Sequence, residues 1–351
     1  MRSLPTGTVE DPYSAHFHRR PSGRNPDGNR SVGGLRMSQS SATPAFRHQP
    51  VMLDEVVELL TAPSVPSGLV LDATVGGGGH AAAVLDARPD FQLVGIDQDP
   101  AAVAAARATL GRFGGRADVA RTRFDRLADV VAGRLLVGAL FDLGVSSPQF
   151  DVAERGFSYR ADAPLDMRMD PAGPTTASHI VNEWDAAELA RLFARHGENR
   201  WAGRIARAVV AARPVATTGE LAEIIRNAIP AAARRTGGHP ARRVFQALRV
   251  EVNGELDVLP GALDAAIAAL APLGRAVVLA YHSGEDRIVK DRFTFAATGG
   301  CVCPPGLPCV CGAVPTVRLL NRGARKPSAA EVADNPRAES ARLRAVEKLA
   351  P

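Results

Sequence analysis

Short apolar runs alternate with helical stretches through the first well-patterned part of the sequence. The runs Leu69–Ala73, Leu93–Asp97 and Ala139–Leu143 have the length and composition of buried strands. Helical periodicity separates them over short connections, which is typical of parallel strands in one sheet. We therefore predict an α/β fold with a doubly wound, mostly parallel sheet. The predicted helices around these strands cover Val51–Leu60, His80–Ala87 and Pro100–Leu110.

The alternation stops between about Asp151 and Val252, where helical periodicity continues without a convincing strand. It resumes with a strand at Arg275–Tyr281, preceded by a helix at 254–270 and followed by one at 286–295. We therefore predict one discontinuous α/β domain, residues 47–150 and 253–351, that carries an all-α insertion at residues 151–252. The predicted helices of the insertion cover Ala186–His196, Arg200–Ala212, Thr218–Ala228 and Arg242–Val252.

The amino-acid composition and the lack of a recognisable signal peptide predict a soluble protein of the reducing cytoplasm. Residues 1–46 are rich in Gly, Pro, Ser, Arg and Asn without hydrophobic periodicity, which predicts a disordered tail. The chain has 46% hydrophobic and 23% charged residues, as ordinary soluble proteins do. Its most apolar long segment, 259–281, contains Asp264, Pro272 and Arg275, so we predict no membrane span. We find no signal peptide, and the sequence leaves the oligomeric state open.

The first predicted strand runs into a glycine-rich turn, Gly76–Gly79, and then a helix. Glycines let the backbone approach a ligand closely, and the free N–H groups of a helix N-terminus suit a nucleotide-like molecule. NAD-binding proteins and plain tight turns share this pattern. By itself, the turn indicates a nucleotide-type cofactor without naming it.

Acidic residues end the three predicted strands. Asp97 lies 18 positions beyond Gly79, where a carboxylate can accept hydrogen bonds from ribose hydroxyls in either NAD or S-adenosylmethionine. Asp72 precedes the glycines, and carboxylates there favour S-adenosylmethionine, which has a cationic sulfonium and no pyrophosphate. The alternative for Asp72, Asp97 and Asp142 is that each caps a helix.

The third strand ends in the sequence Asp142-Leu-Gly-Val-Ser-Ser-Pro-Gln149. The exocyclic amine of a base is a poor nucleophile, and acceptors such as Asp142 and a following carbonyl would favour its nucleophilic form. The base would have to be single-stranded or flipped out. The alternative is that Ser146, Ser147 and Pro148 form only a turn.

Several longer motifs together resemble the MraW/RsmH family over residues 48 to about 345. The matching motifs begin at His48, Asp72, Asp142, Arg155, Pro164, Gly197, His239 and His282. Ala73, Tyr281 and Gly284 depart from the family pattern, in which we expect glycine, phenylalanine and leucine.

The resemblance implies a class I, Rossmann-like methyltransferase that uses S-adenosylmethionine. It implies methylation of the N4 amine of a cytosine in the decoding centre of bacterial 16S ribosomal RNA, with the small ribosomal subunit as partner. Asp142 is the candidate for orienting the amine. The implied cofactor contacts are Gly78, Gly79, His80, Asp97, Phe124, Asp142 and Gln149, with Phe124 stacking on adenine.

Two other functions stay open. A methyltransferase acting on DNA or protein amines is disfavoured, because DNA amino-methylases usually carry an Asp/Asn-Pro-Pro-aromatic loop where this chain has Asp142-Leu-Gly-Val145. A non-catalytic RNA-binding protein or an NAD-dependent protein would differ in which cofactor it binds.

Arginines cluster in the predicted insertion. The chain has a net charge of +5, and between Arg191 and Arg249 twelve arginines face only three glutamates. Arg200, Arg204 and Arg207 recur at helical spacing, opposite an apolar stripe of Trp201, Ile205 and Val209. We predict that these arginines contact the RNA backbone, the alternative being a solvated face.

The four cysteines of the chain are Cys301, Cys303, Cys309 and Cys311. Four soft ligands in a C-x-C-x₅-C-x-C pattern can surround zinc, although C-x-C is tighter than the common C-x₂-C. A zinc ion, a reversible disulfide and four unliganded thiols are the alternatives, and none has a catalytic role in this interpretation.

Overall fold

A computed structural model describes residues 50–145, 149, 152–234, 239–304 and 308–350 of the chain. The chain divides into two units, residues 1–46 and residues 47–351, and the described residues all belong to the second. The predicted disordered tail lies outside the described residues, as do Ser146, Ser147 and Pro148. No helix in the described ranges is long and apolar enough to cross a membrane.

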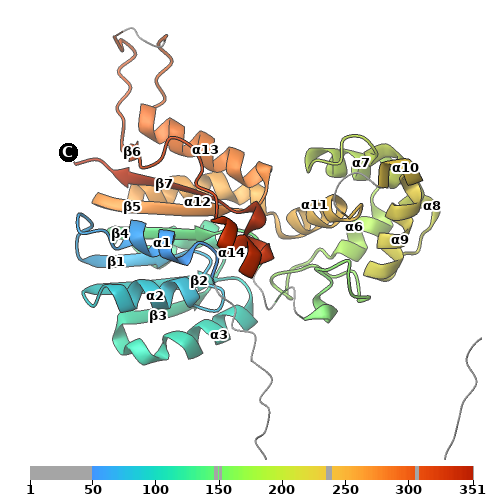
Figure 1. Cartoon of the computed structure of the whole chain (residues 1–351), viewed down its shortest axis with the longest axis horizontal. Coiled ribbons are helices and arrows are strands. Elements are labelled where there is room, and N and C mark those ends of the chain that lie inside the picture. The colour runs from blue at the N-terminus through green and yellow to red at the C-terminus, as the bar shows by residue number, and fades with distance from the viewer. Residues whose placement is uncertain (1–49, 146–148, 150–151, 235–238, 305–307, 351) are drawn as a thin grey trace, which may run out of the picture. The chain divides into compact units, whose positions relative to one another are not determined.

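A seven-stranded sheet organises the second unit (Figure 1). Its strands are β1 (Gly68–Asp72), β2 (Phe91–Asp97), β3 (Ala117–Arg121), β4 (Leu136–Asp142), β5 (Leu270–Ala280), β6 (Val317–Leu319) and β7 (Arg342–Lys348). The order is β3-β2-β1-β4-β5-β7-β6; the first five strands are parallel, and β7 is antiparallel to β5 and β6. The predicted α/β fold with a mostly parallel sheet is confirmed. Because the strand order reverses between β1 and β4, a ligand crevice is expected at the carboxyl ends of these two strands.

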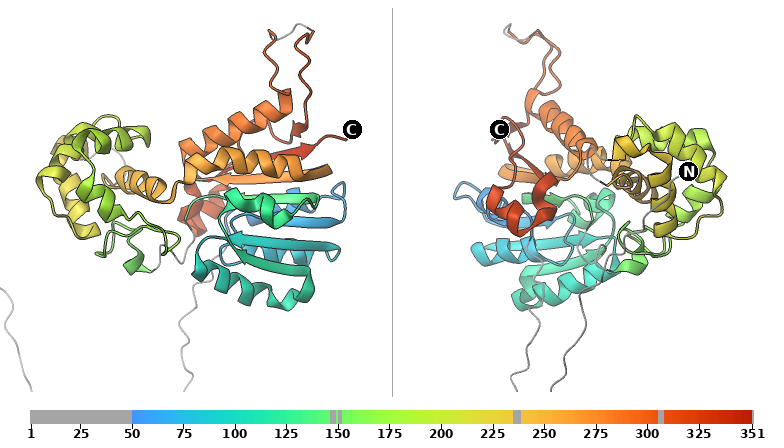
Figure 2. Two further views of the ribbon diagram at one scale, coloured as in Figure 1. Left: turned by 180° about the vertical axis from the view of Figure 1, so that it is seen from behind. Right: turned by 45° about the vertical axis from the view of Figure 1, so that its right-hand side comes forward.

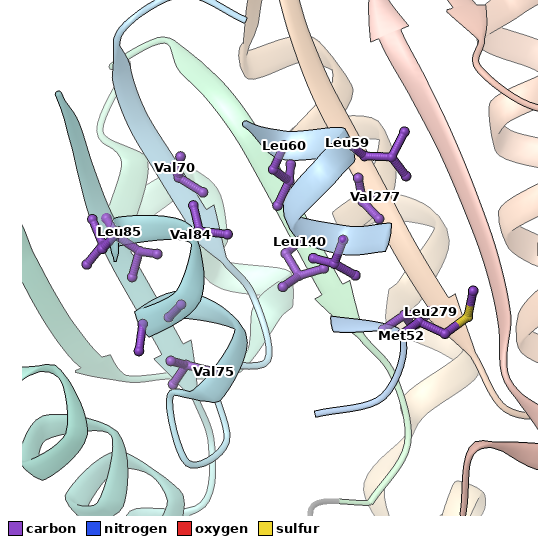
Figure 3. Packing of buried hydrophobic residues seen from close by; sticks show 14 of the residues in the cluster. Met52, Leu59, Leu60, Val70, Val75, Val84, Leu85, Leu140, Val277 and Leu279 are labelled. Carbon is purple, nitrogen blue, oxygen red and sulfur yellow. The ribbon is translucent and has the colours of Figure 1, made fainter. Parts of the chain in front are cut away.

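Helices cover both faces of the sheet because alternate strand residues point to opposite sides. In β1, Val70 belongs to one buried cluster and Leu71 to the other. The first cluster includes residues of α1 (Leu53–Leu60), α2 (Gly79–Ala87) and α3 (Pro100–Leu110), and the second includes residues of α4 (Leu127–Val131), α12 (Glu255–Ala269) and α13 (Ser283–Thr298). Figure 3 shows part of the first cluster, in which Leu60, Val84 and Leu85 pack against Val70 and Leu140.

The chain between β4 and α12 forms a group of helices beside the sheet (Figure 2). These helices enclose a third buried cluster, which includes Phe193, Ile205 and Leu248. The described residues of this part of the chain form no strand, only an isolated β-bridge between Pro164 and Thr217. Its helices are α6 (Ala177–Glu183), α7 (Ala186–Arg195), α8 (Ala202–Ala211), α9 (Thr218–Ala228), α10 (Ala231–Arg234) and α11 (Arg242–Asn253). Capping boxes begin α7 and α9.

Some elements differ from the prediction. Strand β3 was not predicted, because only Val119 of its residues is buried and it lacks the apolar run that marks a buried strand. The charged strand β7 was missed for a similar reason, and β5 begins at Leu270 rather than Arg275. The short elements α14 (Ala329–Asp334), η1 (Gly111–Arg116), η2 (Phe124–Arg126), η3 (Ala153–Arg155) and η4 (Pro336–Ser340) were also not predicted, nor were α4, α6, α10 and β6.

The third cluster makes a direct stability test possible. Phe193 is fully buried in α7, so Phe193→Ala should lower the free energy of opening of this helical segment by about 3–5 kcal/mol. Hydrogen exchange of the amides in α7 and α8 measures this change. The control, Arg191→Ala on the exposed face of α7, should change it by less than about 0.5 kcal/mol. Equal effects of the two substitutions would contradict the assignment of this core.

Candidate active site

Three carboxylates meet at the edge where the strand order reverses. Asp72 ends β1, Asp97 ends β2 and Asp142 ends β4, so three adjacent parallel strands deliver them to one side of the sheet. Asp72 is buried, and its burial raises the pKa to about 8, with further contributions from the charges of Asp142 and Asp97. The structure therefore brings together the acidic residues that the strand pattern predicts at one edge.

The turn between β1 and α2 depends on glycine. Gly76 and Gly78 have φ values of 50° and 81°, in the left-handed region that side chains disfavour. A Cβ on Gly79 would lie 2.5 Å from Cγ of Pro50. Gly78 is the N-cap of α2 and offers no side-chain cap, so the first amides of this helix remain without one. This backbone fits a ligand that accepts hydrogen bonds from a helix N-terminus.

Asp97 holds the two turns on either side of it. Its Oδ2 accepts a hydrogen bond from the Gly76 N–H at 3.1 Å, and its Oδ1 accepts one from the Asp99 N–H at 2.9 Å. Burial raises the pKa of Asp97 to about 6, although these hydrogen bonds act in the opposite direction. Each carboxylate oxygen has a second acceptor position, which a ribose hydroxyl can use.

The helix-cap alternative does not hold for two of the three acids. Asp99, rather than Asp97, caps α3, because its Oδ1 accepts from the Ala101 N–H at 2.9 Å. Asp72 accepts from the Thr74 N–H at 3.2 Å, while the N-cap of α2 is Gly78. Neither Asp72 nor Asp97 is explained by a need to cap a helix.

Asp99 also anchors the chain that follows β4. Its buried Oδ2 accepts from Nε2 of Gln149 at 2.9 Å and from Nη1 of Arg155 at 3.0 Å. Arg155 in turn donates to the carbonyl oxygens of Arg168 and Met169. Gln149 is thus held by Asp99, two residues beyond the end of β2. This role of Asp99 was not predicted, although an aspartate before a proline at a helix start is a known capping signal.

Asp142 has three polar neighbours. Tyr281 donates its hydroxyl hydrogen to Oδ1 of Asp142 at 2.6 Å, and Nδ1 of His80 lies 3.5 Å from Oδ2. The Asp142 N–H donates to the hydroxyl of Thr74 at 2.6 Å. His80 is itself fixed, because its Nε2 lies 3.0 Å from the carbonyl oxygen of Val51, which can only accept. Tyr281, at a position where phenylalanine is expected, therefore contacts the candidate amine-orienting group.

The aromatic residue assigned to adenine lies beyond the end of β3. Phe124 is half-buried at the start of η2, and its ring meets that of Phe141 in β4 edge to face, with centroids 6.1 Å apart. One side of the ring therefore contacts the core, and part of the ring is exposed.

Three helices share a buried polar network that the sequence did not predict. Arg249, near the end of α11, pairs with Glu255 of α12 at 2.9 Å and lies 3.7 Å from Glu285 of α13. Glu285 accepts hydrogen bonds from the backbone N–H groups of Tyr281 and His282 and completes the capping box that begins α13. This network connects the last helix of the helical segment with the residues that follow β5.

A cavity of about 300 Å³ opens beside the carboxylate edge. It lies between Gln98, residues 121–123, Arg168 and residues 252–253, and so between the sheet edge and the helical segment. A second cavity, of about 450 Å³, is lined by residues 122, 123, 125 and 126, and by Asp129, Val130 and Asp170. Both cavities have arginines and aspartates in their walls.

The remaining predicted residues lie away from this edge. Arg200, Arg204 and Arg207 are exposed, while Ile205 and Val209 are buried, so the two predicted stripes are present. No ion pair joins these three arginines to another residue in the described ranges. The sulfur atoms of Cys301, Cys303, Cys309 and Cys311 all lie within 4.8 Å of one another.

The doubly wound sheet, the glycine turn and the acidic strand ends fit an α/β methyltransferase of class I. The chain belongs to the MraW methylase family, whose model matches residues 45–349. The resemblance noted from the sequence motifs is thereby confirmed.

Relatives that share about half of their aligned residues with this protein match most of the chain. The ribosomal RNA small subunit methyltransferase H of Symbiobacterium thermophilum is 53% identical, over 87% of this chain and 98% of that protein. The protein of the same name from Thermobifida fusca is 52% identical, over 88% of this chain and 96% of that protein. A crystal structure of an rRNA methylase from Streptococcus thermophilus is 11% identical, with a TM-score of 0.40 over 87% of this chain and 100% of that chain.

The buried Asp72 makes stability depend on pH. Its pKa rises from 3.8 to about 8 on folding, so between these values the folded state retains a proton that the unfolded state has released. The free energy of unfolding therefore falls as the pH rises through this window. Asp72→Asn should flatten that dependence, as measured by urea denaturation across the window. The exposed control Asp86→Asn should leave it unchanged, and an unaltered slope in Asp72→Asn would refute the assignment.

Proposed function

We propose that this protein transfers a methyl group from S-adenosylmethionine to the N4 amine of a cytosine in the decoding centre of 16S ribosomal RNA. The observation that carries the proposal is the group Asp72, Asp97 and Asp142 beside the glycine turn, at the point where the strand order reverses. Membership of the MraW methylase family supports it, as do relatives named for methylation of small-subunit ribosomal RNA.

The residues at this edge fit S-adenosylmethionine chemically. The cofactor supplies an activated methyl group on a cationic sulfur. The negative charge at this edge favours that cation and the ammonium group of the methionine part, while Asp97 accepts from the ribose hydroxyls. The residues proposed to hold the cofactor are Gly78, Gly79, His80, Asp97, Phe124, Asp142 and Gln149.

Asp142 is proposed to orient the cytosine amine. An amine conjugated with the ring has a delocalised lone pair, and hydrogen bonds accepted from its N–H groups favour the pyramidal, nucleophilic form. The Tyr281 hydroxyl fixes the Asp142 carboxylate and the Thr74 hydroxyl fixes the Asp142 backbone, so the carboxylate can act without first reorganising. Its side chain is one quarter exposed, which leaves room for an approaching base.

Residues 151–252 are proposed to recognise the RNA substrate in the small ribosomal subunit. The cavity lined by Gln98 and Asn253 lies between this segment and the end of the sheet, next in sequence to Asp97, and is the proposed place of entry for a single unpaired base. The exposed arginines of the segment supply positive charge for the phosphate backbone.

A methylation assay tests the reaction. The purified protein should convert one cytosine to N4-methylcytosine in small subunits taken from a strain that lacks this enzyme, as read by mass spectrometry of digested RNA. Asp97→Ala should abolish both this product and detectable S-adenosylmethionine binding, because the ribose loses its acceptor. Asp86→Ala, on the exposed side of α2, is the matched control and should remain active.

Three results would overturn the proposal. They are a different methylated atom, binding of NAD in place of S-adenosylmethionine, and full activity of Asp97→Ala. Parallel reactions with naked 16S RNA and with assembled subunits identify the form of substrate that is used.

The arginine stripe makes a separate prediction. Replacing Arg200, Arg204 and Arg207 with alanine should raise the KM for RNA while leaving the Kd for S-adenosylmethionine unchanged. The slope of log KM against log salt should become shallower by about 0.7–0.9 for each phosphate that the protein no longer neutralises. The same charge removed through Arg112→Ala, Arg322→Ala and Lys326→Ala, all exposed positions outside the helical segment, should affect RNA binding less. Equal effects in both triple variants would show that only net charge matters.

A further inference from the structure

The chain between α13 and β6 makes a long excursion that no packed core supports. It leaves the end of α13, extends beyond it and returns to the sheet edge (Figures 1 and 2). The described residues of 301–316 form no helix or strand. Val302, Val310 and Val314 are 85%, 89% and 72% exposed, so the excursion does not bury its own apolar side chains. Connections of this length without secondary structure are uncommon, and small units without a core usually need a covalent or metal link.

The two arms of the excursion are in close backbone contact at its base, where they leave the domain. A Cβ on Gly299 would lie 2.4 Å from the backbone nitrogen of Val314, and the Thr316 N–H donates to the carbonyl oxygen of Ala296 at 2.9 Å. These contacts hold the two arms where they leave the domain. They do not explain why the arms also meet further out, at the cysteines.

The cysteine sulfur atoms have the spacing of a metal-binding tetrahedron. Cys301 and Cys309 are separated by 3.5 Å, Cys309 and Cys311 by 3.5 Å, and Cys311 and Cys301 by 3.7 Å. Cys303 completes a group in which every pair lies within 4.8 Å. Zinc–sulfur bonds of about 2.3 Å place tetrahedral ligands about 3.8 Å apart. A disulfide would require about 2.05 Å, so the cluster is close to the zinc geometry and far from the disulfide geometry.

The chemistry of the segment also favours a soft divalent cation. Residues 299–316 contain no Lys, Arg, His, Asp or Glu, so sulfur is the only side-chain donor of a metal-binding kind. Thiolate ligands select zinc and other soft metals over magnesium or calcium. No side-chain cation of this segment can offset the charge of several thiolates. The Val310 N–H lies 3.4 Å from the sulfur of Cys303, and such amide contacts stabilise a metal-bound thiolate.

We propose that Cys301, Cys303, Cys309 and Cys311 bind one zinc ion, which links the two arms of the excursion. Binding releases thiol protons to the solvent and forms four zinc–sulfur bonds without oxidation or reduction. Four protein ligands leave no open position for water or substrate, so the ion is structural. The site is separate from the carboxylate edge and does not depend on the proposed methylation reaction.

Metal analysis of the full-length protein tests the proposal. Protein expressed in zinc-containing medium and purified without chelator should contain one zinc per chain, measured by plasma mass spectrometry. Replacing zinc with cobalt should give the intense visible bands of tetrahedral cobalt–thiolate coordination. The four thiols should resist alkylation until a chelator is added, and mass spectrometry should then count four modified cysteines.

Paired variants connect the metal with these residues. Cys301→Ser/Cys311→Ser should lose the zinc and the cobalt bands, while Val302→Ala/Val310→Ala, which changes the residues between the ligands, should retain both. An unchanged far-ultraviolet circular dichroism spectrum and a cooperative urea transition in the cysteine variant show that it is folded. Four freely alkylated thiols in untreated protein, disulfide-linked cysteines, or iron or copper in place of zinc would each overturn the proposal.

Discussion

The accumulation of negative charge where β1, β2 and β4 end is the constraint around which the site is built. Like charges close together in a partly buried region cost free energy. The fold offsets this cost with donors: Thr74 to Asp72, Gly76 and the Asp99 N–H to Asp97, and Tyr281 to Asp142. These donors compensate only partly at Asp72, whose raised pKa means that its carboxyl group is protonated in much of the population at neutral pH.

In the proposed reaction, the cationic sulfonium supplies the positive charge that the site lacks. The product S-adenosylhomocysteine has no such cation, so the same carboxylates favour substrate over product.

The carboxylate edge and the helical segment are joined through a few buried polar contacts. Asp99 caps α3 and also binds Arg155, which reaches the backbone of Arg168 and Met169. Within the helical segment, Asn253 at the end of α11 accepts from the Met169 N–H at 2.7 Å and so ties this stretch of chain to α11. The Asp99–Arg155 pair links the two regions directly, and removing either partner would leave the other charge unsatisfied.

Much of the fold could be predicted because its strands and helices carry strong local patterns. The continuous apolar runs of β1 and β4 follow from burial on both faces, and α3 matches its prediction from Pro100 to Leu110. Strand β7 could not be found this way, since its charged side chains are satisfied by partners far away in the sequence, as Arg344 is by Asp286.

For the same reason, the acidic strand ends were predictable and the network of Arg249, Glu255 and Glu285 was not. Parallel strand topology fixes where the strand ends lie, whereas a network of side chains from three helices depends on tertiary packing.

The hydrogen bond from Tyr281 limits the chemical roles that are open to Asp142. The family resemblance predicts phenylalanine at position 281. The additional hydroxyl of Tyr281 donates a hydrogen bond directly to Oδ1 of Asp142. A donor at that oxygen stabilises the carboxylate and makes it a weaker proton acceptor. The positively charged amine formed by methyl transfer is itself a strong acid, so it can lose its proton without a strong base. In the proposed reaction, Asp142 therefore suits the task of orienting the amine better than that of removing its proton, and its hydrogen bond with Tyr281 limits how its carboxylate can turn.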